Sequence, residues 1–378
     1  MLRDYDIVIV GAGIMGAMTA CELSRGGAKI ALIDQSALPN PGGASFDHSK
    51  VFRFAYPDPF YAGLAVEALK LWRELEEESG TRLLTPTGVL MIGRDESSSE
   101  TETYNALRSL ELEAELLDSS ETARRFPQFN AEAFEFAVYD PNGAILYAER
   151  AVRAALDLAR GRGVSIIEGQ RVIAVEQSEN AGVQIVTGSG EEYQCDRAAI
   201  SAGPWTRKLL PFLDAKLTTT RQETVYFEPA SDSVCFDPGR FPIFIELDSG
   251  FYGFPTHHRG WMKIANHHKG APVEPYEFDD AVGEDFIESC RVFFRRFIPG
   301  LADAQVRETR VCLYNNTPDD DFVVDWHPDV ENVLIVTGFS GHGFKFGSVV
   351  GQIAAELLRS RLTAHNIDRF RLQRLTAR

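Results

Sequence analysis

The segment YDIVIVGAGIMGAMTACELSRGGAKIALIDQ, residues 5–35, decides the fold of this chain. Its first part, residues 5–10, is mostly apolar and predicts a buried strand. Small and apolar residues at helical spacing then predict a helix over residues 15–24. A second apolar run, residues 28–33, predicts another strand. Two strands joined by a helix form a β-α-β unit, so we expect an α/β fold with a parallel sheet.

Three glycines at the first strand–helix junction form a G-x-G-x-x-G pattern, namely Gly11, Gly13 and Gly16. Gly11 permits a tight turn, Gly13 lets a pyrophosphate approach the backbone, and Gly16 lets helix and strand pack closely. The N-terminus of the helix offers free N–H groups to phosphates. Asp34, 18 residues after Gly16, can accept hydrogen bonds from both ribose hydroxyls. The pattern predicts a dinucleotide site and does not separate FAD from NAD, although its position at residue 11 favours a flavoprotein.

The C-terminal part repeats this arrangement. Residues 333–337 predict an apolar strand, and residues 348–361 predict an amphipathic helix. The loop between them contains Gly338, Gly341, Gly343 and Gly347. A second helix N-terminus therefore faces an electron-rich group, for which the pyrimidine edge of a flavin ring is the natural candidate.

Composition excludes several classes of partner. The chain has 378 residues and a formal net charge of −17, which repels phosphate backbones and anionic lipid surfaces. No apolar run reaches the roughly 20 residues that cross a bilayer. The chain enters a predicted strand at once, which leaves no room for a signal peptide, and its five cysteines form no C-x-x-C pair. We expect a cytoplasmic protein without a nucleic-acid or membrane partner.

No metal site is expected. The pairs His257–His258 and His267–His268 lack the separated spacing that metal ligands usually have. These histidines are expected to line a loop or a pocket.

The middle of the chain suggests two interleaved domains. Helices are expected at residues 66–79 and 149–160, and a strand at 85–93. The stretch 197–210 is expected to contain a buried strand that ends in Gly203, Pro204 and Trp205, with mostly β-structure from there to about 310. Charged helical segments at 100–126 are expected to face solvent. We predict a discontinuous cofactor domain over residues 1–85, 145–220 and 310–378, and a β-sheet-rich substrate domain over 86–144 and 221–309.

Four separated stretches carry a resemblance to a known family. They are VIVGAGIMG; KVFRFAYPDPFY with LKLWRELEEESG and TGVLMIG; SAGPW; and RVCLY with FVVDWHP and GFSGHGFKFGS. In these stretches the chain resembles the FAD-dependent amine oxidases of the D-amino-acid-oxidase superfamily, and most of all the group of monomeric sarcosine oxidase, N-methyltryptophan oxidase and pipecolate oxidase. The resemblance implies a Rossmann-like FAD-binding domain interleaved with a β-sheet-rich substrate domain.

The resemblance implies a covalent cofactor. Cys312 matches the cysteine whose sulfur forms a thioether with the 8α carbon of the flavin. A thiolate must reach and attack that carbon, and Arg310 is a candidate to activate it. The alternative is that Cys312 is an inert, buried apolar residue.

The resemblance also implies catalytic roles. Lys263 matches a lysine that contacts flavin N5 through water and activates oxygen; the alternative, which its apolar neighbours disfavour, is a surface lysine in a strand. Arg53 and Lys345 match a pair that binds the substrate carboxylate, and a structural salt bridge is the alternative for Arg53. Tyr252 and His267 match walls of the substrate site, where packing roles are the alternative.

One departure from the family pattern concerns Lys50. It stands where many relatives carry an arginine, so a flexible point charge replaces a rigid fork close to the flavin. The loop that contains Asp47 and His48 also departs from the His-rich loop of the family.

The residues expected to bind FAD come from both ends of the chain. They are Gly11, Gly13, Ile14, Met15, Gly16, Asp34, Gln35, Ser45, Ser49, Lys50, Val172, Gly203, Trp205, Cys312, Gly341, Gly343, Phe344 and Lys345.

The expected activity is FAD-dependent oxidation of a secondary or N-methylated amino acid to an imine, which water hydrolyses, while O2 becomes hydrogen peroxide. One alternative is a dehydrogenase that passes electrons to a quinone or carrier protein. A second is a flavin subunit that needs a partner chain, and a third is an NAD-dependent enzyme. The sequence leaves open which amine is preferred and whether the chain is a monomer or a homo-oligomer.

Overall fold

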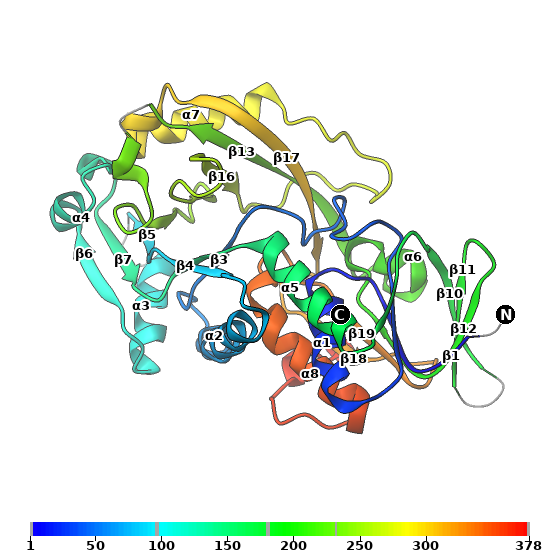
Figure 1. Ribbon diagram of the computed structural model, residues 1–378. Coiled ribbons are helices and arrows are strands. Elements are labelled where there is room, and N and C mark those ends of the chain that lie inside the picture. Colours follow the sequence, from blue (N-terminus) through cyan, green and yellow to red (C-terminus); the bar gives the residue numbers. More distant parts are fainter. Residues whose placement is uncertain (1–2, 95–97, 179–181, 231–232, 376–378) are drawn as a thin grey trace.

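The computed structural model describes residues 3–94, 98–178, 182–230 and 233–375. Its first sheet contains the predicted β-α-β unit (Figure 1). The strand β1 (Arg3–Val10) lies between β12 (Glu192–Ile200) and β2 (Ile30–Ile33), parallel to both. The sheet continues through β9 (Ser165–Ile167), β10 (Val172–Gln177), β11 (Val183–Thr187), β18 (Val323–Trp326) and β19 (Val333–Thr337). Because β19 runs parallel to β12, the carboxyl ends of β1, β2, β12 and β19 meet at one edge.

Three helices pack together against this sheet (Figure 1). They are α1 (Ile14–Leu23), α5 (Ala148–Gly161) and α8 (Gly347–Ser360). The helix α8 approaches α1 so closely that a Cβ atom on Gly351 would lie 2.4 Å from Cβ of Met18. The two glycine loops that precede α1 and α8 are therefore brought to the same edge of the sheet.

A second sheet carries the other half of the molecule. Its strands follow the order β17 (Gln305–Asn316), β13 (Thr218–Glu228), β16 (Met262–Asn266), β15 (Phe251–Gly253), β14 (Ile243–Ile245), β5 (Val89–Gly93), β7 (Phe136–Asp140) and β6 (Glu115–Asp118). The amphipathic helix α7 (Glu284–Phe297) buries Phe293, Phe294 and Phe297 in the core of this half. Figure 1 shows β13 and β17 as two long strands that run from α7 toward the first sheet.

Smaller elements complete the fold. A three-stranded sheet contains β3 (Lys50–Phe52), β8 (Ala144–Leu146) and β4 (Leu84–Pro86). The remaining α-helices are α2 (Pro59–Ser79), α3 (Ser99–Ser109), α4 (Ser119–Arg125) and α6 (Thr206–Leu209). No described helix is both long and apolar enough to span a bilayer.

The predicted fold class is confirmed, because a mixed α/β architecture combines a Rossmann-like sheet with a second, β-rich half. The domain boundaries stay a prediction. All strands of the first sheet fall within residues 1–85, 145–220 and 310–378. However, β13 and β17 each cross a predicted boundary, at residues 220–221 and 309–310.

Several predicted elements differ from the structure. The helix expected at 66–79 begins at Pro59, because the carboxylate of Asp58 accepts a hydrogen bond from the N–H of Phe60 and caps it. The strand expected at 85–93 is two strands, β4 and β5, in different sheets. The strand expected to end in Gly203, Pro204 and Trp205 ends earlier, at Ile200, and those three residues form a 3-10 turn before α6.

One further expectation was wrong, and another holds for most but not all of its residues. The region before residue 310 contains α7, whose helical spacing of phenylalanines was not recognised. Glu100, in the segment expected to face solvent, is only 2% exposed at the start of α3.

The close contact of α1 and α8 predicts opposite effects for two glycine substitutions. Gly351→Ala should destabilise the protein by about 1–3 kcal/mol, because the added methyl group would collide with Met18, including its backbone. The matched control is Gly63→Ala in α2, where no neighbouring atom lies within 4 Å of the new Cβ. That change should stabilise the helix by roughly 0.5–1 kcal/mol. Thermal unfolding of both variants checks this, and equal shifts would contradict it.

Candidate active site

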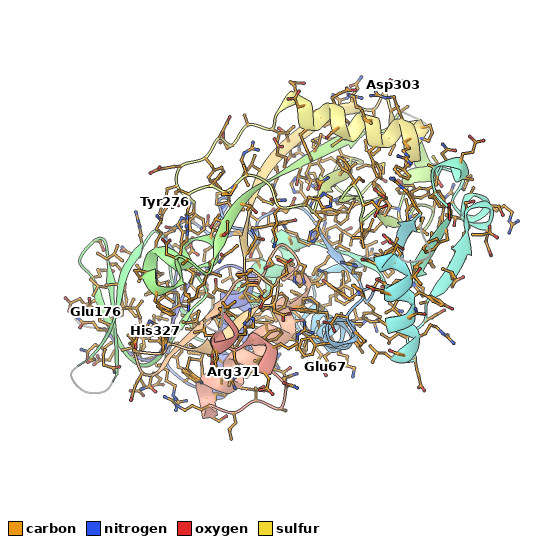
Figure 2. The ribbon with its side chains drawn as sticks, turned by 180° about the vertical axis from the view of Figure 1, so that it is seen from behind. Glu67, Glu176, Tyr276, Asp303, His327 and Arg371 are labelled. Atoms are coloured by element: carbon orange, nitrogen blue, oxygen red, sulfur yellow. The ribbon has the colours of Figure 1, made fainter. Side chains whose placement is uncertain are left out.

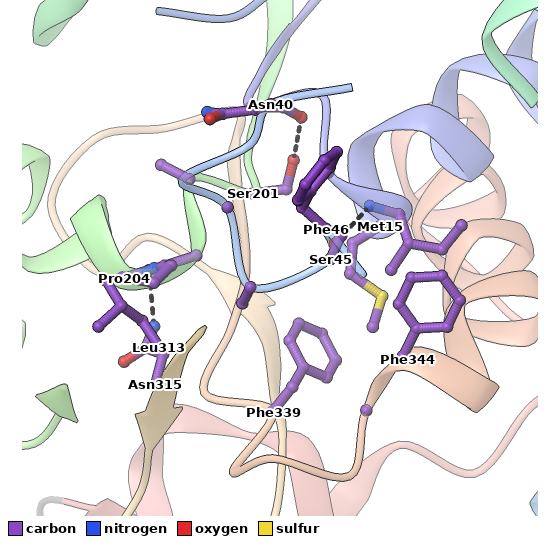
Figure 3. Close-up of a pocket in the computed structure, with 18 of the residues that line it drawn as sticks. Met15, Asn40, Ser45, Phe46, Ser201, Pro204, Leu313, Asn315, Phe339 and Phe344 are labelled. Atoms are coloured by element: carbon purple, nitrogen blue, oxygen red, sulfur yellow. Dashed lines mark hydrogen bonds between the residues drawn. The ribbon is translucent and has the colours of Figure 1, made fainter. Parts of the chain in front are cut away.

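A long cavity lies at the edge of the first sheet where its parallel strands end. Ligands of open α/β sheets bind at such an edge. The lining comes from the start of α1, the end of β2, residues 39–46, the end of β12 and the loop after β19. Figure 3 shows Ser45 beside the start of α1, with Phe339 and Phe344 of the loop after β19 nearby. The cavity therefore joins the two glycine loops that the sequence singled out.

The first glycine loop needs its glycines for backbone packing. Gly11 has a φ of +100°, and a Cβ atom there would lie 2.4 Å from the carbonyl oxygen of Ser201. A Cβ on Gly16 would lie 1.9 Å from the carbonyl oxygen of Gly11. The N–H of Ile14 donates to Oγ of Ser45 (2.9 Å), which ties the loop over residues 39–46 to the start of α1.

Asp34 ends β2 inside the cavity and is held by three donors. Its Oδ2 accepts from the N–H of Ala12 (2.8 Å), and its Oδ1 accepts from the N–H of Ser36 (3.0 Å) and from Nδ2 of Asn40 (3.1 Å). Burial raises the pKa of Asp34, while the backbone donors oppose that shift. This geometry fits an acceptor for ribose hydroxyls.

An aromatic pair stands near this end of the cavity. Tyr276, on the loop between β16 and α7, lies on the same side of the molecule as Glu176 and away from Asp303 (Figure 2). Its hydroxyl donates to Oε1 of Gln35 (2.8 Å), and its ring lies 5.8 Å from that of Trp205. Among the described side chains, Nε1 of Trp205 is buried without a hydrogen-bond partner. An orphaned donor in the lining fits a bound polar cofactor.

The second glycine loop places Lys345 in the cavity. Nε1 of Trp72 donates to the carbonyl oxygen of Lys345 (2.6 Å), and the Trp72 ring is parallel to that of Phe344. Gly341 has a φ of +77° and packs against the ring of Tyr314. These contacts fix the loop through Trp72 of α2 and Tyr314 of β17.

Two cations from distant segments share the cavity. Nζ of Lys345 donates to the hydroxyl of Tyr56 and to the carbonyl oxygen of His342, both at 2.8 Å. A guanidinium nitrogen of Arg53 donates to the carbonyl oxygen of Ala55, and the group lies 4.3 Å from the centre of the Tyr56 ring. Burial, Arg53 and Lys50 together hold the pKa of Lys345 well below its usual range. Within the described part of the chain neither cation has a carboxylate partner.

His267 and Tyr252 also line this end. Burial, Arg53 and Lys345 lower the pKa of His267 to about 4, so its imidazole is neutral near neutral pH. Taken over the whole residue, His267 is nevertheless exposed to solvent. Burial raises the pKa of Tyr252, which therefore keeps its proton.

A buried ion pair lies behind this wall. Nζ of Lys263 donates to Oδ2 of Asp47 (2.5 Å) and to the carbonyl oxygen of Ser49 (2.8 Å). The ammonium group of Lys50 lies 3.5 Å from Oδ2 of the same carboxylate. Burial opposes the charged form of Asp47, but Lys263 and Lys50 outweigh burial and hold its pKa well below the usual range.

Cys312 lies on β17 beside these charges. Burial raises the pKa of its thiol, while Lys50 and Lys263 oppose that shift. The next two residues, Leu313 and Tyr314, line the cavity. Arg310, considered as its activator, instead pairs with Glu308.

A separate cluster contains His48, His258 and Glu308, whose potential ligand atoms lie within 4.8 Å of one another. The guanidinium of Arg310 pairs with Glu308, and its NH2 nitrogen lies 2.8 Å from Nε2 of His48. Arg310 already supplies a positive charge next to Glu308 and His48. These residues therefore form an ion-pair cluster.

The structure gathers most of the predicted site residues and separates four of them. Gly11, Gly13, Ile14, Met15, Asp34, Gln35, Ser45, Lys50, Arg53, Val172, Gly203, Trp205, Tyr252, His267, Gly341, Gly343, Phe344 and Lys345 line the cavity. Gly16, Ser49, Lys263 and Cys312 are not among its described lining residues. Gly16 packs beneath the loop, and the other three lie next to the wall around Lys50.

Three polar residues of the site were missed by sequence reasoning. Tyr56 is hydrogen-bonded to Lys345, Asn40 to Asp34, and Asp47 to Lys263. Asp47 was noted only as a departure from the family pattern. Its ion pair with a residue 216 positions away has no local signal in the sequence.

Comparison with known proteins agrees with this geometry. The family model for FAD dependent oxidoreductases matches residues 6–357. Monomeric sarcosine oxidase of Bacillus sp. (strain B-0618) is 33% identical over 99% of this chain and 97% of its own length. N-methyl-L-tryptophan oxidase of Yersinia pestis (strain Pestoides F) is 29% identical over 98% of this chain and 99% of its own length.

A solved structure has the same fold. The L-proline dehydrogenase from P. horikoshii superposes with a TM-score of 0.86 at 20% identity, over 99% of each chain.

Proposed function

Since this chain belongs to the family of FAD-dependent oxidoreductases, we propose that it oxidises a secondary or N-methylated amino acid. The product is an imine, which water hydrolyses to an amine and a carbonyl compound. Two electrons pass to FAD and then to O2, which gives hydrogen peroxide. The names of the two relatives, which concern sarcosine and N-methyl-L-tryptophan, support this class of substrate.

One observation carries the proposal. Arg53 and Lys345 lie in the same cavity, and neither has a carboxylate partner among the described residues. A buried lysine and a half-buried arginine that repel each other favour a bound anion between them. A carboxylate suits this place, because a planar guanidinium can bind its two oxygens together.

The surrounding residues then hold the rest of the substrate. Tyr56 keeps the ammonium of Lys345 oriented through its hydroxyl, and burial raises the pKa of Tyr56 to about 12, so it stays neutral. His267 and Tyr252 are uncharged at neutral pH and can face the amine without repelling it. FAD would supply the acceptor for the hydride, which carries both electrons of the oxidation. The chain contributes orientation and charge placement.

We assign the remaining predicted roles as part of this proposal. The nucleotide end of FAD lies along Gly11, Gly13 and Asp34, and the ring lies near Lys50 and the loop over 341–345. Lys263 supplies positive charge that assists the reduction of O2. Cys312 links the flavin covalently, and its neighbours Leu313 and Tyr314 already line the cavity.

A panel of amines tests the proposal directly. Sarcosine, larger N-methylated amino acids and cyclic imino acids should bleach the yellow flavin colour without air, and air should restore it with one peroxide per amine. Primary amines without a carboxylate should not. Bleaching that only an added quinone or carrier reverses would make the protein a dehydrogenase. Absence of bleaching by all carboxylated amines would reject the proposed activity.

The carboxylate clamp predicts effects on KM. Arg53→Ala should raise KM for carboxylated amines by roughly 10- to 100-fold, as expected when a hydrogen bond to a charged group is lost. The matched control is Lys269→Ala, since Lys269 is an exposed lysine already paired with Asp320. Its KM should match the wild type. Equal changes in both variants would place the clamp elsewhere.

The lowered pKa of Lys345 adds a pH dependence to this clamp. Lysine binds an anion only while protonated, so KM for carboxylated amines should rise as pH rises through that lowered pKa. Lys345→Met should raise KM and remove this dependence.

The covalent link predicts where the colour goes after denaturation. Acid-precipitated wild type should keep its flavin in the pellet, because a thioether survives unfolding. Cys312→Ser should release the colour into the supernatant, whereas Cys290→Ser, in the buried second core, should not. Release of the colour from the wild type would remove the covalent assignment.

A further inference from the structure

The ammonium group of Lys263 is buried more completely than any other described cation. Its side chain is 1% exposed, and Asp47 is 3% exposed. Oδ2 of Asp47 lies 2.5 Å from Nζ, and the carbonyl oxygen of Ser49 lies at 2.8 Å. The ring of Phe254 covers another side, 5.0 Å from its centre to Nζ. Asp47 is the carboxylate that forms an ion pair with this lysine.

Asp47 is itself fixed by other donors. Its Oδ1 accepts from the hydroxyl of Tyr226 (2.5 Å) and from the N–H of His48 (2.8 Å). Tyr226 and Lys263 are directly opposite each other on the antiparallel strands β13 and β16. The carboxylate is therefore held between a loop and the second sheet.

Other charged and titratable groups also face this pair. Lys50 lies 3.5 Å from Oδ2 of Asp47 and repels Lys263. Cys312 on β17 and His257, which follows β15, also interact electrostatically with Lys263 or Asp47. Glu308 and Arg310, both on β17, interact electrostatically with Tyr226. Of these groups, Asp47 makes the closest contact with the ammonium.

Two opposite effects are possible for a carboxylate in this position. It can cancel the positive charge of Lys263, or it can keep the lysine charged where burial would otherwise remove its proton. Burial of an ammonium group costs several kcal/mol, and one carbonyl oxygen does not offset that cost. Lys50 adds repulsion. With Lys263, Lys50 and Asp47 together, the group retains a net positive charge.

We propose that Asp47 is a positioning residue that keeps Lys263 protonated and fixed in the wall next to the bound FAD, so that the oxygen reaction does not vary with pH. This inference rests on the proposed function, in which Lys263 assists the reduction of O2. Without the carboxylate, Lys263 keeps its burial and its repulsion from Lys50 and loses its main stabilising partner. Its proton is then released as pH rises through the working range.

The test compares Asp47→Asn with the wild type and with Lys263→Met. The measurement is the rate constant for reoxidation of the amine-reduced enzyme by oxygen, between about pH 6 and pH 10. The wild type should give a flat profile. Asp47→Asn should approach the wild-type rate at the acid end and fall as pH rises, by up to about tenfold per pH unit while Lys263 deprotonates. Lys263→Met should be slow at every pH.

A second measurement does not depend on turnover. This measurement is the reduction potential of the bound FAD as a function of pH. In Asp47→Asn the plot should have an additional change in slope, a break, at the pH where Lys263 loses its proton. The wild type and the double variant Asp47→Asn/Lys263→Met should lack this break. Asp47→Glu, which retains the charge, should remove the break. Should Asp47→Asn fail to fold, Asp47→Ala, which also removes the carboxylate, takes its place and should show the same pH dependence.

Two results would overturn the inference. A profile of Asp47→Asn parallel to that of the wild type would mean that Lys263 keeps its proton unaided. Faster reoxidation at all pH values would mean that Asp47 serves to weaken the positive charge. If the wild type oxidises no amine or ignores oxygen, the proposed function fails instead, and the potential measurement still decides the role of Asp47.

Discussion

The absence of a side chain at Gly16 is the constraint on which the site depends. A methyl group there would stand 1.9 Å from the carbonyl oxygen of Gly11, so any larger residue would push α1 away from β1. The N-terminus of α1 could then no longer sit at the carboxyl ends of β1, β2 and β12. Helix α8 rests on α1 through Gly351, and it carries the loop with Lys345 at its own start. The first glycine loop and the loop with Lys345 thus depend for their positions on one close contact.

The cavity is electrically asymmetric along its length. The end at the first glycine loop, where we propose that the nucleotide binds, contains Asp34, which is held by backbone donors and suits neutral hydroxyl groups. Its other end contains Arg53, Lys345 and Lys50, with Lys263 behind the wall. The chain as a whole has a net charge of −17, so this cationic end lies within an acidic protein. An anionic amine is attracted by local side chains rather than by the overall field, which repels it.

The sequence predicted what local patterns can encode. The glycine fingerprint and Asp34 indicated the first sheet and the nucleotide end, because turn, helix start and strand end are neighbours in the chain. The resemblance indicated Arg53 and Lys345, which the structure brings into one cavity. Contacts between residues far apart in the chain could not be predicted. The residues around Asp47 contain no pattern that indicates its contacts with Lys263 and Tyr226. Helix α7 was missed because its six charged residues and its phenylalanines occur in a stretch between strands, where β-structure was expected.

The two long strands β13 and β17 have a consequence for how this architecture can be divided. They pair along the whole of β13, from Thr218 to Glu228, and Nδ2 of Asn315 at the end of β17 donates to Gly203 and to Thr337 in the first half. Dividing the chain at residues 220–221 or 309–310 would split β13 or β17. One fragment would then expose unpaired backbone N–H and C=O groups, and the other would lack part of the cavity wall. Recombination that exchanges one half of the molecule as a unit would therefore disrupt the fold. Variation is expected instead in the loops that connect these strands and helices.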